Sequence, residues 1–251
     1  MLGLIVGLIR ERLFRKLRSA EDVQSALELP CLGTIPDGGK LGILSLCEPG
    51  SQQLSGKAAS SQLKMQSGLA HLTLALLAET KPLDRRVLTV TSLRKGEGVT
   101  SMATALAYNL CRLGKKVSLI DANIGGSHSE RSESPKTGAA SGLPASGAQD
   151  DHPRFYQDWP GLVFTPAEAI ADVSTLERMI NTARNAFDYV IIDAPPLEDG
   201  LDVLPTLNAS DGVLLLLNAT TARKSQVVSA LASWSYMSGK ILGAILNRAR
   251  K

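Results

Sequence analysis

RVLTVTSLRKGEGVTSMATALAYNLCRLGKKVSLIDAN, residues 86–123, is the stretch that decides the fold of this chain. It opens with the short, β-branched apolar run Val87–Thr91, and glycines follow at positions 96 and 98. A short apolar run that ends at glycine is typical of a buried strand entering a sharp turn. A helix is expected from about Thr100, and a second strand ends at Asp121. The stretch therefore predicts the front half of a phosphate-binding α/β domain.

The glycine loop has the features of an anion-binding site. Gly96 and Gly98 allow the backbone to turn its N–H groups into the loop. The helix that follows adds unpaired amides and the positive end of its dipole. The hydroxyl of Thr100 is placed to reach a magnesium ion. We expect a nucleotide phosphate to be held by the loop residues Gly96, Glu97, Gly98, Val99, Thr100 and Ser101.

The loop lacks one residue of the nucleoside-triphosphate pattern G-x-x-x-x-G-K-[ST]. Laid on residues 93–100, the pattern finds Gly98 and Thr100, but Leu93 replaces the first glycine and Val99 the lysine. One charge-assisted hydrogen bond contributes roughly 1.5–3 kcal/mol, and losing one donor to a transition state costs on the order of 100- to 1,000-fold in rate. We therefore expect binding to survive and turnover to be impaired.

Two alternatives stay open for this loop. Arg94 or Lys95 could supply a substitute cation, although two solvated loop charges are the simpler interpretation. Gly96-x-Gly98-x-x-Ser101 is also a degenerate dinucleotide fingerprint, with Asp121 as the ribose acid. Three residues separate the strand from the first glycine, and a serine stands where the third glycine or alanine belongs. The triphosphate loop is thus the better interpretation.

Composition narrows the class of protein. The chain has 251 residues, 44% of them hydrophobic and 20% charged, as expected for an ordinary globular protein. A net charge of +3, with four Tyr, four Phe and two Trp, gives no basis for a nucleic-acid partner. Three cysteines without metal-like spacing indicate a reduced, cytosolic setting, and the three histidines form no ligand set.

Residues 1–18 form a membrane-proximal basic segment. Nine uncharged residues precede five Lys or Arg and one Glu at positions 10–18. A spanning helix needs about 20 apolar residues, so this segment is too short to cross a bilayer. It is either an interfacial anchor on the membrane surface or the cytoplasmic end of a membrane helix that lies upstream, and an ordinary frayed terminus is the third possibility.

The rest of the chain divides into two regions. Residues 19–62 are predicted to form a short helix, with Ser19 as N-cap, followed by a flexible linker with a brief strand near Leu41–Leu46. Residues 63–251 are predicted to form the α/β domain, which begins with a helix over Leu63–Leu77. Within it, residues 127–158 are polar and rich in Ser, Gly and Pro, and are expected to be a disordered insertion.

A second acid follows a later strand. The run Tyr189–Asp193 is apolar up to its final carboxylate, which is the Walker B arrangement, although a strand-end acid that caps a turn is common. Asp121 ends its strand in the same way, so both acids are expected at the rim where open parallel sheets bind ligands. We expect Thr100, Asp121 and Asp193 to bind magnesium, with Asp121 and Asp193 as the candidate catalytic residues.

Further strands alternate with helices to the end of the chain. Ser174-x-x-Glu177 is a capping box that opens a helix to Phe187, and a later helix is expected over residues 222–237. Near-continuous aliphatic strands separated by helices predict an α/β fold with a doubly wound, mostly parallel sheet and helices on both faces. Asn247 follows the last strand at the same rim, where it could contact a base or simply end the strand.

Together these motifs resemble the cytoplasmic domain of bacterial tyrosine kinases. The resemblance is carried by residues 90–98, 119–122, 187–196 and 243–248. These kinases belong with polysaccharide co-polymerases of capsule and exopolysaccharide export, on the MinD/ParA-like branch of P-loop NTPases. The resemblance implies ATP or ADP with Mg²⁺, membrane co-polymerase or export proteins as partners, and a place on the cytoplasmic face of the bacterial inner membrane. Assembly with further copies of the chain is also implied.

The chain departs from this family at several positions. Val99 replaces the loop lysine, Asn123 a second acid, and Gly125 and Gly126 two arginines. The helix at 63–77 lacks the Glu/Arg/Arg spacing used for ring assembly, and a tyrosine-rich tail is missing, with Tyr236 nearest. We expect a kinase-like regulator of polysaccharide polymerisation and export, with phosphoryl transfer impaired or lost. The alternatives are an active ATPase or tyrosine autokinase that uses Arg94 or Lys95, and a nicotinamide-binding protein.

Overall fold

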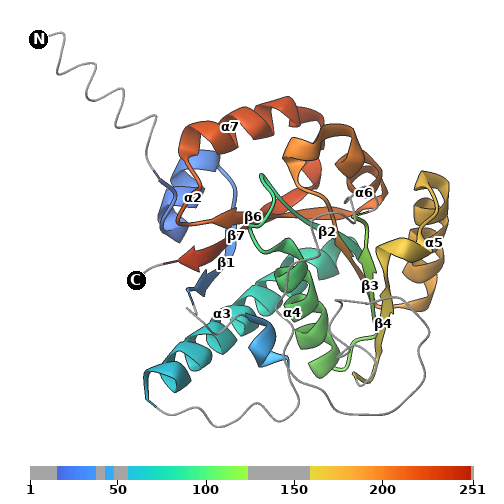
Figure 1. The fold of residues 1–251 in the computed structure, drawn as a ribbon, viewed down its shortest axis with the longest axis horizontal. Helices are drawn as coiled ribbons and strands as arrows, with labels where there is room; N and C mark the ends of the chain where they lie inside the picture. Colours follow the sequence, from blue (N-terminus) through green and yellow to red (C-terminus); the bar gives the residue numbers. More distant parts are fainter. Residues whose placement is uncertain (1–15, 38–42, 48–55, 124–158, 250–251) are drawn as a thin grey trace, which may run out of the picture.

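The computed structural model describes residues 16–37, 43–47, 56–123 and 159–249 (Figure 1). In these ranges one 7-stranded sheet has the order β1-β7-β6-β2-β5-β3-β4, and every pair of neighbouring strands is parallel. The strands are β1 (Cys31–Pro36), β2 (Val87–Ser92), β3 (Val117–Asp121), β4 (Leu162–Thr165), β5 (Tyr189–Asp193), β6 (Gly212–Asn218) and β7 (Ile241–Ala249).

Helices cover both faces of the sheet. One face packs against α3 and α4, and the other against α2, α5, α6 and α7 (Figure 1). The α-helices are α2 (Ala20–Leu27), α3 (Lys57–Thr80), α4 (Val99–Arg112), α5 (Val173–Ala186), α6 (Leu204–Ala209) and α7 (Lys224–Ser233). Short 3-10 helices are η1 (Ile43–Leu46), η2 (Lys81–Leu83), η4 (Ala167–Ala169), η5 (Leu197–Val203) and η6 (Ser235–Lys240). The predicted doubly wound α/β fold is confirmed.

The central strands are buried on both sides, which explains their continuous aliphatic sequence. Every residue of β2, β3, β5 and β6 is buried. Successive side chains of a strand point to opposite faces, so Leu88 and Val90 join the core beneath α4, whereas Val87 joins the core on the other face. This alternation also decides which face receives the acid at the end of each strand.

The chain enters the fold at the carboxyl side of the sheet. The Leu17 N–H donates to the Ala222 carbonyl at 3.1 Å, and Lys16 Nζ donates to the Thr220 carbonyl at 3.0 Å. Leu17 is buried in the core on the α7 face. The predicted N-cap at Ser19 is confirmed, because its hydroxyl accepts the Asp22 N–H at 3.1 Å.

Some predicted elements are wrong. Residues 43–46 form a 3-10 helix rather than a strand. The N-cap of α5 is Asp172, which accepts the Thr175 N–H at 2.7 Å, so Ser174 is the second residue of the helix and opens no capping box. Helix α3 begins at Lys57, and α7 ends at Ser233 before η6 begins.

Two predicted segments lie largely or wholly outside the described residues: the basic segment 1–18, apart from residues 16–18, and the insertion 127–158. Within the ranges that the structure describes, no helix combines the length and hydropathy needed to cross a membrane.

Candidate functional site

The loop between β2 and α4 has a backbone that suits a bound phosphate. Gly96 has φ +76° and Gly98, the N-cap of α4, has φ +100°, conformations that other L residues rarely adopt. A Cβ on Gly98 would lie 3.0 Å from Asn247 Nδ2, whereas one on Gly96 would meet nothing within 4 Å. Among the described residues, no side chain caps the start of α4. The first N–H groups of this 14-residue helix therefore form an anion-binding end that fits a phosphate.

Val99 is the first residue of α4, at the position where the pattern has lysine. It is half-buried and packs against the hydrophobic core beneath α3 and α4. Thr100, the second residue of the helix, is exposed, and Ser101 is half-buried. The side chain at position 99 thus contributes to packing and brings no positive charge to the loop.

The two basic residues of the loop, Arg94 and Lys95, contact other parts of the protein. Lys95 Nζ lies 3.8 Å from Asp199 Oδ2 of η5, and 72% of the lysine side chain is exposed. Arg94 lines a cavity of about 840 Å³ with η5 and α7, on the face of the sheet opposite α4. In this structure neither side chain takes the place of the missing lysine.

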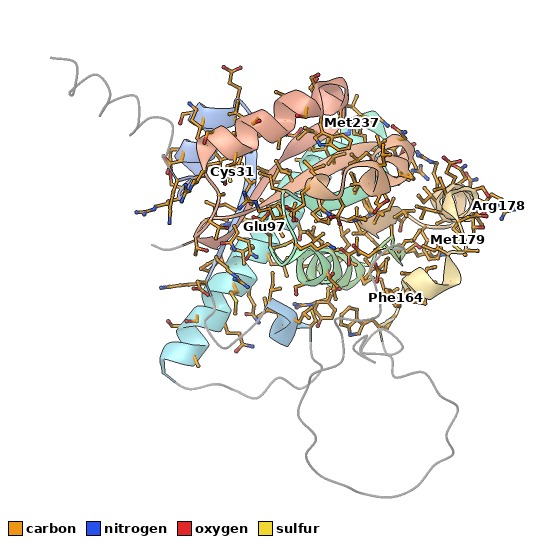
Figure 2. All side chains as sticks on the ribbon, turned by 45° about the horizontal axis from the view of Figure 1, so that its top comes forward. Cys31, Glu97, Phe164, Arg178, Met179 and Met237 are labelled. Atoms are coloured by element: carbon orange, nitrogen blue, oxygen red, sulfur yellow. The ribbon has the colours of Figure 1, made fainter. Side chains whose placement is uncertain are left out.

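The Glu97 side chain is buried inside the glycine loop and accepts a hydrogen bond from its backbone. It is 7% exposed, and its Oε2 accepts the Leu93 N–H at 3.2 Å. Burial raises the pKa of the Glu97 carboxyl, against the opposing effect of the Arg94 and Leu93 N–H groups. Figure 2 shows Glu97 near the middle of the molecule, away from Arg178 at the α5 side. A buried acid thus fixes the shape of the loop.

Asn247 ties the loop to β7. Its Nδ2 donates to the Glu97 carbonyl at 3.0 Å, and its Oδ1 accepts the Arg248 N–H at 2.9 Å. Arg248 has φ +53°, a left-handed conformation that this contact accompanies. Both polar atoms of the amide are therefore engaged in holding protein backbone, and contact with a base stays a prediction.

The two strand-end acids lie side by side. Asp121 of β3 and Asp193 of β5 are direct partners in the sheet register, and the Ala122 N–H donates to the Asp193 carbonyl at 2.8 Å. Asp193 is also in register with Val90 of β2, which leads into the glycine loop. Side chains alternate along a strand, and both acids fall on the face of the sheet that packs beneath α4. Asp121 is 4% exposed and Asp193 is 3% exposed. The structure thus brings both acids and the loop to one rim.

Asn123 contacts the first of these acids directly. Its backbone N–H and its Nδ2 both donate to Asp121 Oδ1, at 3.0 and 2.7 Å. The same Nδ2 lies 3.5 Å from the Asp193 carbonyl. Within the described ranges, no group of three or more His, Cys, Asp or Glu is arranged to hold a metal ion. A cation at this rim would therefore rely on Thr100 and the two acids.

Sequence reasoning missed the residues that fasten the loop to η5. The Lys95 N–H donates to Glu198 Oε1 at 2.9 Å, and the Glu198 N–H donates to the Leu93 carbonyl at 3.2 Å. Thr91 Oγ1 donates to the Pro195 carbonyl at 2.6 Å and holds the turn after β5. The only signal in the sequence was the proline pair after Asp193, which marks a sharp turn but does not give its direction.

Comparison with known proteins identifies several relatives. A protein-family model described as cellulose biosynthesis protein BcsQ matches residues 85–126. Tyrosine-protein kinase CpsD of Streptococcus agalactiae serotype III (strain NEM316) is 32% identical over 179 residues, 67% of this chain and 76% of CpsD. Tyrosine-protein kinase YwqD of Bacillus subtilis is 27% identical over 79% of this chain and 88% of YwqD.

Solved structures share the fold. The BceF tyrosine kinase domain superposes with a TM-score of 0.67 at 18% identity, over 94% of this chain and 100% of that domain. The kinase domain of Escherichia coli tyrosine kinase ETK gives a TM-score of 0.63 at 17% identity, over 89% of this chain and 91% of that one. At these identities the likeness establishes the fold alone.

Proposed function

Because the chain belongs to the family of bacterial tyrosine-protein kinases that includes CpsD, we propose that it is a kinase-like regulator with impaired phosphoryl transfer. It binds nucleotide at the loop between β2 and α4 and regulates the polymerisation and export of a capsular polysaccharide or exopolysaccharide. Support for the polysaccharide comes from a relative named succinoglycan biosynthesis transport protein ExoP, of Rhizobium meliloti, which is 29% identical over 66% of this chain and 22% of ExoP.

The observation that carries the proposal is the placement of Val99. Its side chain packs into the core at the first position of α4, so the loop offers backbone N–H groups without a lysine ammonium. Backbone amides and a helix N-terminus are enough to bind a phosphate. Transfer of a phosphoryl group needs positive charge on the phosphate oxygens in the transition state. A loop of this kind therefore favours binding over catalysis.

Nucleotide binding has support from a further relative. An uncharacterized ATP-binding protein of Methanocaldococcus jannaschii is 25% identical over 63% of this chain and 62% of that protein. The loop residues Gly96 to Ser101 would hold ATP or ADP. If Mg²⁺ accompanies the nucleotide, it supplies positive charge to the phosphates, and Thr100, Asp121 and Asp193 are the residues that would hold it.

The proposed regulator works through membrane partners. Residues 1–18 would lie at the membrane surface, residues 19–62 would connect them to the domain of residues 63–251, and the insertion at 127–158 would remain disordered. The partners would be polysaccharide co-polymerase or export proteins at the cytoplasmic face of the bacterial inner membrane. The chain would act by docking to these proteins.

The alternative is an active ATPase or tyrosine autokinase in which Lys95 or Arg94 replaces the lysine. One observation favours it: the Lys95 side chain is mostly exposed and its contact with Asp199 is long, at 3.8 Å, so the ammonium could be released toward a phosphate. An exposed ion pair contributes little, in general about 0–1 kcal/mol. The two candidates differ in whether the unmodified chain turns over ATP.

Turnover of radiolabelled ATP, measured with Mg²⁺, tests the proposal. We expect the wild type to bind ADP in calorimetry without hydrolysing ATP above background. Val99→Lys should raise hydrolysis by about 100- to 1,000-fold, because it restores the missing donor. Val99→Met is the matched control, since it adds length without charge and should stay silent. Robust hydrolysis by the wild type that Asp193→Asn abolishes would contradict the proposal in favour of the active enzyme.

A further inference from the structure

Helix α3 carries apolar residues on two opposite sides. Met65, Leu72 and Leu76 lie on the side that packs into the core, and they are buried. On the other side, Leu63 is 69% exposed and Leu74 is 60% exposed. Figure 1 shows that α3 extends to the periphery of the molecule. An exposed apolar stripe opposite the core is typical of a surface that contacts another molecule.

The exposed stripe is continuous along the helix. At 3.6 residues per turn, residues spaced four, four, three, four and four apart stay within about 100° of the helix circumference. The residues with this spacing form the α3 stripe, and they are Ala59, Leu63, Ser67, Ala70, Leu74 and Ala78. Ala59 is half-buried and the other five are exposed. The two leucines project between small residues, so a second helix can approach the stripe closely and pack around both.

The α3 stripe suits a protein surface better than a lipid surface. From residue 58 to residue 78, Lys64 is the one side chain that is charged at pH 7. A helix that lies on an anionic membrane carries Lys and Arg along its polar face, and α3 lacks such a row. Charged residues are depleted at the centre of protein interfaces. The low charge of this side of α3 therefore indicates a protein partner.

The spacing of the α3 stripe is the same when it is read from either end. If a second copy of the chain lies antiparallel, with the midpoint of the contact between residues 68 and 69, Leu63 faces Leu74 of that copy. In the same register Ser67 faces Ala70, and the two outer alanines face each other. A two-fold interface requires this reciprocity, because residue i contacts j and residue j contacts i. A parallel pair would need no such symmetry, so the spacing favours an antiparallel pair.

The area of the stripe sets the strength of this contact. Residues 59–78 span about 30 Å of helix, and a stripe about 10 Å wide over that length covers about 300 Å² on each copy. The total of about 600 Å² is below the roughly 1,200 Å² that a stable interface buries. Two copies would therefore associate reversibly, and the pair would form at high local concentration.

We propose that the α3 stripe is a self-association surface, through which two copies of this chain pack antiparallel about a two-fold axis between residues 68 and 69. The inference goes beyond the proposed function, because the contact needs neither a nucleotide nor a membrane partner. The leucines of each copy fill the spaces between the small residues of the other.

Sedimentation equilibrium of the full chain over a wide range of concentration tests this surface. We expect a monomer–dimer equilibrium with a Kd on the order of 100 µM, as suits a contact of this size. Leu63→Lys and Leu74→Glu should each weaken the dimer by about 10-fold or more, because each places an unpaired charge against a leucine. Leu83→Glu is the matched control, since Leu83 is 64% exposed in η2 but lies outside the stripe. This variant should associate like the wild type.

A mixture of the two single variants tests the antiparallel register. In a mixed pair the introduced lysine faces the introduced glutamate, and the two remaining leucines face each other, so the mixture should recover most of the wild-type association. A wild type that stays monomeric up to about 1 mM overturns the proposal. An equal loss of association in Leu74→Glu and Leu83→Glu also overturns it. A mixture that associates no better than either single variant overturns the antiparallel register.

Discussion

A carboxylate accepts backbone N–H groups at each end of strand β2, but the two carboxylates differ in their surroundings. At the amino end, Asp211 Oδ2 accepts the N–H groups of Arg86 and Val87, each at 2.9 Å. At the carboxyl end, Glu97 accepts the N–H of Leu93 in the glycine loop, at 3.2 Å. Each acid fixes the backbone where the central strand begins or ends.

The two acids differ in their charge partners. Arg184 Nη1 lies 2.7 and 2.8 Å from the two carboxylate oxygens of Asp211. Burial of Asp211 would raise its pKa, but the Val87 and Arg86 N–H groups and Arg184 outweigh burial and lower the pKa. For Glu97, burial prevails and the pKa is raised. The fold thus places a carboxylate with a close positive partner at the amino end of the strand, and one whose burial outweighs its partners at the end that carries the candidate site.

Breaking the amino end should have the largest effect on stability. Asp211→Ala removes the acceptor of two strand N–H groups and leaves the partly buried Arg184 without its carboxylate. We expect a loss of about 2–3 kcal/mol in the free energy of unfolding, measured by urea denaturation. The site end should be unaffected, so ADP affinity at low temperature should stay within 2-fold.

Asp188→Ala is the matched control for this change. Asp188 also precedes a strand and accepts one N–H, that of Lys116 at 2.8 Å, but it is exposed. We expect its loss to cost about 0.5–1 kcal/mol. Equal losses in the two variants would contradict the claim that the pairing with Arg184 distinguishes Asp211.

A pH series with Asp211→Asn sharpens the comparison with a smaller effect. The folded pKa of Asp211 is lowered from 3.8, so its stabilising contribution is fully present above about pH 4 and is lost as pH falls through the folded pKa. The wild type should therefore exceed Asp211→Asn in stability at neutral pH, and the difference should shrink in acid. Stability is measured by thermal denaturation across the acid range. If the curves of the wild type and Asp211→Asn run parallel, the ionised Asp211 carboxylate does not stabilise the fold.

Glu97→Gln should have the smallest effect and the opposite dependence on pH. The folded pKa of Glu97 is raised above 4.5, so its protonated form is favoured and stability falls as pH rises through the folded pKa. Glutamine keeps an acceptor for the Leu93 N–H, and we expect a change below about 1 kcal/mol in unfolding free energy. The free energy of unfolding of Glu97→Gln should increase relative to that of the wild type as pH rises. If it instead loses stability at neutral pH, the carboxylate form is the stabilising one.

Much of the fold could be predicted because the strands carry their own signal. Aliphatic runs that end at glycine or at an acid predicted β2, β3 and β5, and the carboxyl ends of these parallel strands had to share one rim. The brief strand predicted near residues 41–46 was wrong. Residues 43–46 are mostly apolar but form a 3-10 helix that packs near α4, and a run so short has no periodicity by which a strand and a helix could be told apart.

The positions of the candidate-site residues at one rim were predictable, but their hydrogen bonds were not. Strand-end position was enough to place Asp121 beside Asp193, because parallel register follows from the topology. The partner of Asn123 and the destination of Lys95 depend on side-chain directions across the rim, and a single sequence carries no record of them. Glu198 was missed for the same reason, since it reaches the loop from a turn over 100 residues later in the chain.

The point where the chain joins the sheet gives the fold a mechanical property. Leu17 and Lys16 donate hydrogen bonds to the segment that follows β6. Asn218, the last residue of β6, is in register with Asn247, whose side chain donates to the Glu97 carbonyl. A force that displaces Lys16 or Leu17 would thus reach the glycine loop through the ends of β6 and β7.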